Sequence, residues 1–469
     1  MNPTTLFSKK SLLLAGLALI LLNACKKENS ATAPPFTVPV ALEATNITPV
    51  SFTANWEKDG AASYNLYVAT DSNFANPVSG YNPQSVKPDS AILTGLPSNK
   101  DYFYKLVAVN SKGELSAPSN IIHVQTPDPS ADRFVYIGSE DKNLYCFYAG
   151  TGAKVWTFAT SGDIESSATI SGGVLYFGSS DQRLYAIDAV TGVKQWGFLA
   201  GGAVLSSPTV GTDGVYIASY SGMMFGVNKN GSQKWSAQPS GNSQLMSSPA
   251  YSNGIVYFGS KDNNLYAFDA ASGTKLWTAA TGDSINSSPA VSNGVVYVGS
   301  SDKNAYAFDA ATGALKWKYA TGDSILSSPT ISNGILYVGS FDGKMYALDA
   351  VTGAIKWSTS TGGRIGSSPT VSNGVVYAGS YDNKLYAFDA VTGAIKWSTA
   401  TGGRILSSPT VSNGVVYAGS YDNNLYAFSV ATGAVKWAAA TGGTIRLASP
   451  TVLTFPGNVI MPGISGDVQ

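Results

Sequence analysis

The sequence predicts an all-β protein, in which an eight-bladed β-propeller of four-stranded blades follows a smaller β-sandwich. The first observation is a repeat of about 40 residues that fills most of the chain after residue 133. A period in this range is typical of repeat architectures. The second is that each copy holds four short apolar or β-favouring runs, separated by turn residues and without a helical period. One tryptophan marks each copy: Trp156, Trp196, Trp235, Trp277, Trp317, Trp357, Trp397 and Trp437.

The copy from Ile405 to Trp437 shows what one blade contains, and it recurs almost unchanged from Ile365 to Trp397. Asn413-Gly414 predicts a tight hairpin turn, because both residue types tolerate a positive φ. Asp422-Asn423 and Thr432-Gly433 predict the next two turns. The tryptophans are expected to fill the widening gap between neighbouring blades. The strands expected in this copy are Ser407–Ser412, Val415–Ser420, Leu425–Ser429 and Ala434–Ala438.

The two ends of the repeat region are expected to share one blade and so close the ring. The chain enters at Phe134 with residues that match a second strand, and a first strand for that blade remains at the far end, Ala448–Val452. Pairing these segments removes two exposed sheet edges. Gly457–Gly463 resembles a further second strand, for which a cap, a swapped strand and a frayed tail remain alternatives.

The motif Ala-x-Thr-Gly-x-x-x-Trp, present as Ala390-Val391-Thr392-Gly393 and Trp397, resembles the repeat of quinoprotein-like (PQQ-like) propellers. The resemblance covers Arg133 to about Val452 and implies the propeller fold. The same repeat builds quinone-cofactor dehydrogenases and non-catalytic lipoproteins. Among the latter, the chain is similar to the propeller lipoproteins of the outer-membrane β-barrel assembly machine, which hold other components through their propellers.

Residues 1–25 predict a bacterial lipoprotein signal peptide. Lys9 and Lys10 precede an apolar run, Leu12–Leu22, that is too short to span a bilayer comfortably, and a small residue precedes Cys25. We expect cleavage before Cys25 and lipid on its sulfur. An ordinary secretory signal with an incidental cysteine is the alternative. Several acyl chains would hold the protein firmly at the outer membrane, on its periplasmic or its cell-surface face.

Residues 26–35 predict a polar tether, residues 36–127 a separate domain, and residues 133–469 the propeller. Within 36–127, Ser51–Trp56 and Tyr64–Val68 alternate as half-buried strands. Leu96-Pro97 and the residues that follow resemble a fibronectin type III domain. The resemblance implies that Trp56 lies in the core, that the Tyr102 hydroxyl bonds back to the backbone, and that the domain is a spacer. The residues that follow are Tyr102, Tyr104, Leu106, Ala108, Asn110 and Gly113.

Little in the composition indicates catalysis or nucleic-acid binding. The formal net charge is zero, and 12% of residues are charged, against about 25% in a typical domain. The single histidine, His123, leaves no partner for a triad or a multi-histidine metal site. Cys146 is expected to be a small buried residue where other copies have alanine. The adjacent cysteines typical of quinone-dependent dehydrogenases are missing, so we expect no enzyme activity and no cofactor.

An aspartate recurs at the turn between the second and third strands of most copies. Each turn supplies one carboxylate, whereas calcium takes six or more oxygen ligands. We therefore expect turn caps at these positions rather than metal sites. The series is Asp141, Asp181, Asp262, Asp302, Asp342, Asp382 and Asp422.

The loops that join blades and the turns between second and third strands are expected to share one face. On this face the early and middle copies carry acids, at Asp163, Glu165, Asp283 and Asp323. The late copies carry arginines and aromatic residues, which we expect to share one arc, mostly across the axis from the acids. Arginine and tyrosine are favoured at protein interfaces. Ordinary variation between recently duplicated copies is the alternative. The candidate partner-binding residues are Phe341, Arg364, Tyr381, Arg404, Tyr421 and Arg446.

The sequence therefore predicts a non-catalytic, lipid-anchored scaffold of the bacterial envelope that binds other envelope proteins and no nucleic acid, as the resemblance to the assembly-machine lipoproteins implies. A surface glycan-binding protein using Tyr381 and Tyr421 is one alternative. A PQQ-dependent dehydrogenase, which bound quinone would reveal, is the other.

Overall fold

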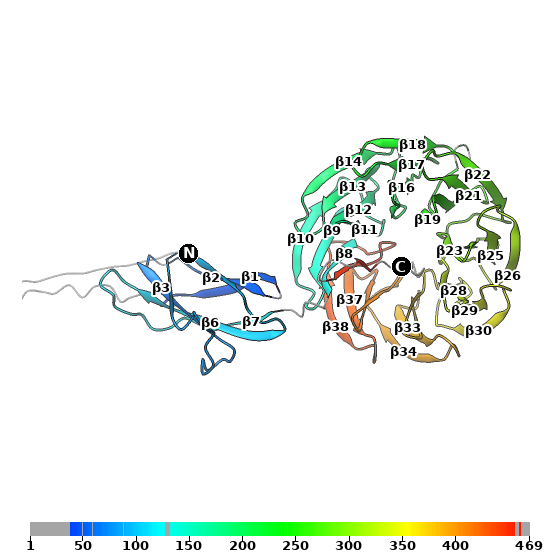
Figure 1. Ribbon diagram of the computed structural model, residues 1–469. Helices are drawn as coiled ribbons and strands as arrows, with labels where there is room; N and C mark the ends of the chain where they lie inside the picture. Colours follow the sequence, from blue (N-terminus) through cyan, green and yellow to red (C-terminus); the bar gives the residue numbers. More distant parts are fainter. Residues whose placement is uncertain are drawn as a thin grey trace, which may run out of the picture. The chain divides into compact units, whose positions relative to one another are not determined.

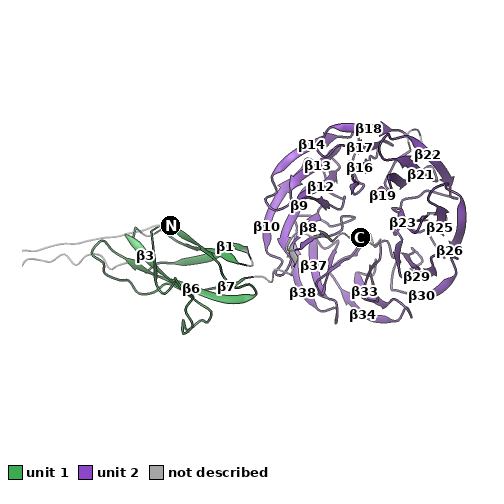
Figure 2. Ribbon diagram, in the orientation of Figure 1, with its two compact units in different colours: residues 1–126 green, residues 127–469 purple. Residues whose placement is uncertain are grey.

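The computed structural model describes residues 38–48, 50–58, 60–87, 89–126, 132–239, 241, 243–454 and 459–460. The chain divides into two compact units, residues 1–126 and residues 127–469 (Figure 2). All secondary-structure elements of the described residues are β-strands. None of these residues belongs to a helix long and apolar enough to cross a membrane. The predicted signal peptide, Cys25 and the tether lie outside the described residues.

Unit 1 contains two antiparallel sheets. Trp56 is 2% exposed in a core to which both sheets contribute, as predicted. The Tyr102 hydroxyl donates to the Pro97 carbonyl oxygen at 3.0 Å, which confirms the predicted bond to the backbone. One sheet has the order β1 (Ala41–Thr48), β2 (Ser51–Trp56), β5 (Ser90–Thr94); the other has the order β4 (Gln84–Val86), β3 (Ser63–Ala69), β6 (Lys100–Val109), β7 (Ile122–Thr126).

The described residues of unit 2 form seven four-stranded sheets and one five-stranded sheet, arranged in a ring (Figure 1). This confirms the all-β, propeller-like architecture. In each sheet the strand nearest the axis is short, and the strand farthest from it forms the rim. The first strands, which lie nearest the axis in the four-stranded sheets, are β11 (Thr169–Ser171), β15 (Thr209–Val210), β19 (Ala250–Ser252), β23 (Ala290–Ser292), β27 (Thr330–Ser332), β31 (Thr370–Ser372) and β35 (Thr410–Ser412); in the five-stranded sheet the first strand is β39 (Thr451–Thr454), with one further strand at its inner edge.

The remaining strands follow in order of distance from the axis. The second strands are β12 (Val174–Ser179), β16 (Val215–Ala218), β20 (Ile255–Gly259), β24 (Val295–Gly299), β28 (Ile335–Gly339), β32 (Val375–Gly379), β36 (Val415–Gly419) and β8 (Asp132–Gly138). The third strands are β13 (Arg183–Asp188), β17 (Met224–Val227), β21 (Asn264–Asp269), β25 (Asn304–Asp309), β29 (Lys344–Asp349), β33 (Lys384–Asp389), β37 (Asn424–Ser429) and β9 (Asn143–Tyr148). The outer strands are β14 (Lys194–Leu199), β18 (Gln233–Ala237), β22 (Lys275–Ala280), β26 (Leu315–Ala320), β30 (Ile355–Ser360), β34 (Ile395–Ala400), β38 (Val435–Ala440) and β10 (Lys154–Ala159).

The two ends of the repeat region share one sheet, as predicted. β39 pairs antiparallel with β8, with Thr451 opposite Tyr136 and Val452 opposite Val135. The opposite edge of β39 pairs with β40 (Val459–Ile460), which lies within the segment that resembles a further second strand. That segment therefore adds a fifth strand to the shared sheet.

A circle of serines links the innermost strands. Each serine donates its backbone N–H to the hydroxyl oxygen of the serine in the next sheet, at N–O distances of 2.9–3.0 Å. The last bond runs from Ser449 to Ser167 and closes the circle. Its members are Ser167, Ser207, Ser248, Ser288, Ser328, Ser368, Ser408 and Ser449.

This circle explains why the prediction of a strand over Ser407–Ser412 was wrong at its start. β35 begins at Thr410, because the preceding residues are engaged elsewhere. Ser407 accepts the Gly419 N–H, and the Ser408 N–H bonds Ser449 in the next sheet. Pro409 has no N–H to donate to a ladder.

The tryptophans form a second set of joints at the rim. Each indole N–H donates to a backbone carbonyl of the next sheet at 2.9–3.1 Å. The indole rings also cover the glycine of the turn between the third and outer strands of that sheet, as Trp357 covers Gly393. The predicted filling of gaps between sheets is thus confirmed, but only Trp235 and Trp357 are buried. The other six are half-buried, and all eight lie on the outermost strands.

Candidate interaction face

One face of unit 2, here called the loop face, consists of the loops between sheets and the turns between second and third strands. These segments lie together because antiparallel neighbours alternate the end of the sheet at which they connect. Backbone bonds hold turn and loop in register: the Phe341 N–H donates to Ser324, the Tyr381 N–H to Arg364, and the Tyr421 N–H to Arg404, each at 2.9 Å. The loop face therefore brings the predicted candidate residues onto one surface.

Four of the six candidates form a contiguous group, here called the Arg-aromatic cluster: Phe341, Arg364, Tyr381 and Arg404. The guanidinium carbon of Arg364 lies 5.2 Å from the centre of the Phe341 ring, and that of Arg404 lies 5.2 Å from the centre of the Tyr381 ring. The two rings are 5.6 Å apart and inclined at 60°. Such cation–π contacts hold each guanidinium flat against its ring. The sheets thus present two fixed, exposed cations above two half-buried rings.

The two arginines of this cluster form no ion pair with the residues that the structure describes. None of the ion pairs in this part of the chain includes Arg364 or Arg404. Their positive charge is therefore available to a carboxylate or phosphate from outside.

Arg446 lies in a different environment. Its Nη1 is 3.6 Å from Glu165 Oε1 and 4.0 Å from Glu140 Oε1, and the guanidinium also hydrogen-bonds Tyr421. Burial raises the pKa of Glu165, although Arg446 acts in the opposite direction. The expectation that the acids lie across the axis from the arginines is wrong here, because ring closure makes the first and last repeats neighbours. Arg446 is thus paired with two acids of the first repeat at the seam, and Tyr421 belongs to the same group through its bond to the guanidinium.

The sequence analysis missed Gly366, which lies beside both rings of the cluster. A Cβ at this position would be 3.3 Å from a ring carbon of Phe341 and 3.3 Å from a ring carbon of Tyr381. The glycine therefore leaves these ring edges without a covering side chain. The signal was present in the sequence, since the otherwise similar copy has Leu406 there. The equivalent residues of the other loops are Glu165, Leu205, Met246, Asn286, Leu326, Leu406 and Arg446.

The recurring aspartates cap the turns of the loop face, which confirms their predicted role. Asp382, for example, accepts the Lys384 N–H on Oδ1 at 3.2 Å. Its Oδ2 accepts the Tyr386 hydroxyl at 2.5 Å and the Gly362 N–H of a neighbouring loop at 3.0 Å. Both oxygens therefore serve the fold. No set of three or more acidic, histidine or cysteine side chains in the described residues could hold a metal ion.

Aspartates also cap the turns between third and outer strands, at the opposite end of the sheets. Asp389 Oδ1 accepts the N–H groups of Val391 and Thr392, and Oδ2 lies 3.2 Å from Lys396 Nζ. These bonds, the Thr392 N–H first and Lys396 next, lower the pKa of Asp389 to about 2. Bonds from the Thr352 N–H and hydroxyl lower the pKa of Asp349 likewise to about 2.

We expect these two caps to make folding stability fall in acid. The folded-state pKa values lie below the ordinary value of 3.8, so the stabilisation is present above about pH 4 and is lost towards pH 2. The measurement is the Tm between about pH 5 and pH 2 for the wild type and for the Asp349→Asn, Asp389→Asn double variant. The variant should show a shallower decline. Parallel curves for the two proteins would contradict the role of these caps.

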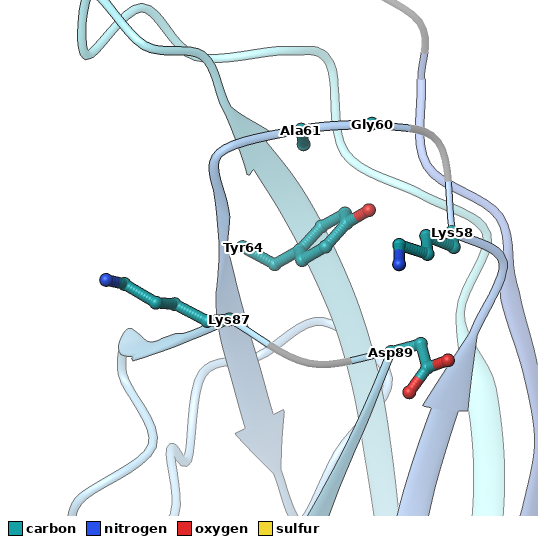
Figure 3. Close-up of a pocket in the computed structure, with 6 residues that line it drawn as sticks. All are labelled: Lys58, Gly60, Ala61, Tyr64, Lys87 and Asp89. Carbon is teal, nitrogen blue, oxygen red and sulfur yellow. The ribbon is translucent and has the colours of Figure 1, made fainter.

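Unit 1 contains a pocket of about 270 Å³, slightly below the range usual for ligand sites. Figure 3 shows that the Lys87 amine points away from Asp89, so the charged groups do not converge. The pocket therefore offers no constellation for catalysis. Its lining residues are Lys58, Gly60, Ala61, Tyr64, Lys87 and Asp89.

His123 and Cys146 have structural surroundings. His123 Nε2 is 2.8 Å from Asp101 Oδ1, and the ring stacks on Phe103 across the β6–β7 ladder. Cys146 is a small buried residue in a hydrophobic cluster of unit 2, as predicted.

Three comparisons place this fold among known proteins. None of the curated proteins compared with the chain matches it. Among solved structures, BamB from Moraxella catarrhalis is 23% identical with a TM-score of 0.54, and the match covers 61% of this chain and 91% of that one. The computationally designed protein Ika8 is 16% identical with a TM-score of 0.56, covering 65% of this chain and 97% of that one. At these identities the likeness is one of fold.

Quinohemoprotein alcohol dehydrogenase ADHIIG from Pseudomonas putida HK5 is also similar, at 16% identity and a TM-score of 0.54, covering 64% of this chain and 71% of that one. The fold alone therefore does not separate enzymes from non-enzymes. A family profile described as outer membrane protein assembly factor BamB matches residues 107–319, 261–365, 323–402 and 357–468, which together span more than half of the chain. The chain belongs to this PQQ-like family of outer membrane protein assembly factor BamB.

Proposed function

We propose that this protein is a non-catalytic scaffold of the bacterial envelope, which binds other envelope proteins through the loop face and contributes to outer-membrane protein assembly. The observation that carries the proposal is the Arg-aromatic cluster, in which Arg364 and Arg404 are exposed above Phe341 and Tyr381. Arginine and aromatic side chains are the residue types that most often dominate binding energy at protein interfaces. Membership of the BamB family supports the envelope setting.

The proposal includes the architecture in full. Residues 133–469 form an eight-bladed propeller, supported by the closed circle of eight serines. Residues 36–127 form a fibronectin type III domain, supported by a three-stranded sheet on a four-stranded sheet and by the Tyr102 bond to Pro97. Residues 1–25 are a signal peptide, Cys25 carries the lipid anchor at the outer membrane, and residues 26–35 are the tether.

The absence of catalysis is part of the same proposal. The carboxylate oxygens of Asp382 and its equivalents already accept hydrogen bonds from their turns. Cys146 is the only cysteine of unit 2, since Cys25 is the only other one in the chain, so unit 2 does not contain the pair of adjacent cysteines typical of quinone-dependent dehydrogenases. Glycan binding is less well supported, because the Tyr381 ring is in contact with Arg404 and Phe341 rather than free to stack on a sugar.

The test is photo-crosslinking in intact cells. A photoreactive residue at Tyr381 is expected to trap one or more envelope proteins, which mass spectrometry identifies. The matched control is the same residue at Val391, which is 77% exposed in a turn at the opposite end of the sheets. Replacing Arg364, Arg404 and Tyr381 together should reduce recovery of the partner at least about tenfold, in line with the loss of hot-spot residues. Equal trapping at Val391, or undiminished recovery by the triple variant, would refute the proposal.

A further inference from the structure

We propose that the Arg-aromatic cluster, with the ring edges that lie beside Gly366, binds an acidic, extended segment of a partner protein. An apolar side chain of the segment lies against the two rings, and flanking carboxylates bind the two guanidinium groups. The inference rests on the proposed function and names the chemistry of the partner that the loop face recognises.

The apolar half of the site comes from one missing side chain. Seven of the eight equivalent loop positions carry a side chain, and Gly366 is the exception. A Cβ added to Gly366 would lie 3.3 Å from a ring carbon of Phe341 and 3.3 Å from one of Tyr381, which is closer than an ordinary contact, so both rings pack directly against this glycine. The backbone there has no positive φ that would require glycine. Because residue 366 has no side chain to cover the half-buried rings, a partner's apolar side chain can contact their outer edges.

The charged half comes from two arginines that are held in place but not neutralised. Each guanidinium is fixed over a ring at 5.2 Å, so little side-chain freedom remains to be lost when it binds a carboxylate. The planar group also matches a carboxylate with two parallel hydrogen bonds.

Loop composition makes the two loops of the cluster more positive than the two loops before them. The two preceding loops carry Asp283-Ser284 and Asp323-Ser324, whereas the loops of the cluster carry Gly363-Arg364 and Gly403-Arg404. Each of the latter lacks an acid and gains a cation. Complementary charge of this kind favours an acidic partner and speeds the encounter.

Arg446, at the seam between the first and last repeats, differs from these two arginines because it is already paired with acidic side chains. Its guanidinium already contacts Glu165 and Glu140. A phosphate group would also suit two arginines without an ion pair, but it would not use the exposed edges of two aromatic rings. The observations therefore favour a peptide over an anionic lipid headgroup.

The test is fluorescence anisotropy with a labelled heptapeptide that has one central phenylalanine between two pairs of glutamates. We expect the full-length protein to bind it at least about tenfold more tightly than the same peptide with glutamines, and more weakly as salt is raised from about 50 to about 200 mM. A third peptide, with glycine in place of the phenylalanine, should also bind at least about tenfold more weakly.

Two variants separate the halves of the site. Gly366→Leu should weaken binding of the acidic peptide at least about tenfold without altering charge, because a leucine here would displace the two rings or cover their edges. The Arg364→Gln, Arg404→Gln double variant should abolish the preference for glutamates. The matched control is Lys142→Gln, Lys303→Gln, which removes two exposed charges from turns of the loop face where Gln182 stands in another copy. It should leave the affinity within about twofold, as expected for charges at the edge of an interface.

The inference is overturned if the glutamine peptide binds as tightly as the acidic one, or if Gly366→Leu binds like the wild type. It is also overturned if vesicles containing an anionic phospholipid displace the peptide while the free peptide fails to displace the vesicles. Should crosslinking at Tyr381 still trap an envelope protein in any of these cases, the scaffold proposal stands and only the acidic segment is rejected.

Discussion

Removing residues 448–469 is expected to lower the free energy of unfolding of the propeller unit by at least about 5 kcal/mol. The deletion removes β39, whose Val452 and Leu453 are 0% and 7% exposed. Burial of two such side chains stabilises by roughly 1.5–3 kcal/mol each. The deletion also breaks the serine circle at Ser449 and exposes the edge of β8, which invites aggregation.

Removal of residues 455–469 alone is the matched control, because it keeps β39 and deletes β40. We expect it to change the free energy of unfolding by less than about 2 kcal/mol, since only two residue pairs join β40 to β39. Urea denaturation measures both losses, and size-exclusion chromatography detects association through the exposed edge. If both truncations lower the free energy of unfolding equally, the ring is stabilised by β40 rather than by the pairing of β39 with β8.

Gly393→Ala is expected to destabilise the protein by about 2–5 kcal/mol. Gly393 has φ +74°, and an added Cβ would lie 2.6 Å from the indole of Trp357 in the neighbouring sheet. Two costs therefore add. The left-handed backbone costs roughly 1–2 kcal/mol for alanine, and forcing the indole away costs typically 1–3 kcal/mol.

Gly374→Ala in the same sheet separates these costs. Its φ is +73°, and no atom lies within 4 Å of the position of the added Cβ. Gly374→Ala should therefore lose only the roughly 1–2 kcal/mol of stability that the left-handed backbone costs an alanine. Thermal and urea denaturation of the two variants compare them directly. If both lose the same stability, the Trp-Gly contact between sheets contributes nothing measurable to the ring.

The residues of the repeat predicted most of the fold. The turn pairs Asn413-Gly414 and Thr432-Gly433 set the hairpins, and the apolar runs between them became strands close to the predicted bounds. The pairing of the first and last segments also followed from the repeat, because only one first strand, at Ala448–Val452, remained for the blade entered at Phe134. These features depend on neighbours in the chain or on the count of copies, so they can be read locally.

The candidate site was predictable only in part. Phe341, Arg364, Tyr381 and Arg404 were selected as departures from the repeat, and the structure brings their side chains together. Arg446 was selected on the same ground, but its charge is taken by Glu140 and Glu165. Sequence distance concealed this pairing, since about 280 residues separate Arg446 from Glu165 and the two meet only when the ring closes.

The amino-acid sequence alone determined the repeating unit, its four strands and the residues that depart from the pattern. The tertiary structure decided that Arg364 and Arg404 are exposed without an ion pair, whereas Arg446 is paired with acids of the first repeat. It also decided that Gly366 lies between two aromatic rings and that the serines form a closed circle. The reason is that hydrogen bonds and ion pairs between sheets depend on the position of each sheet around the axis, which local patterns of residues do not encode.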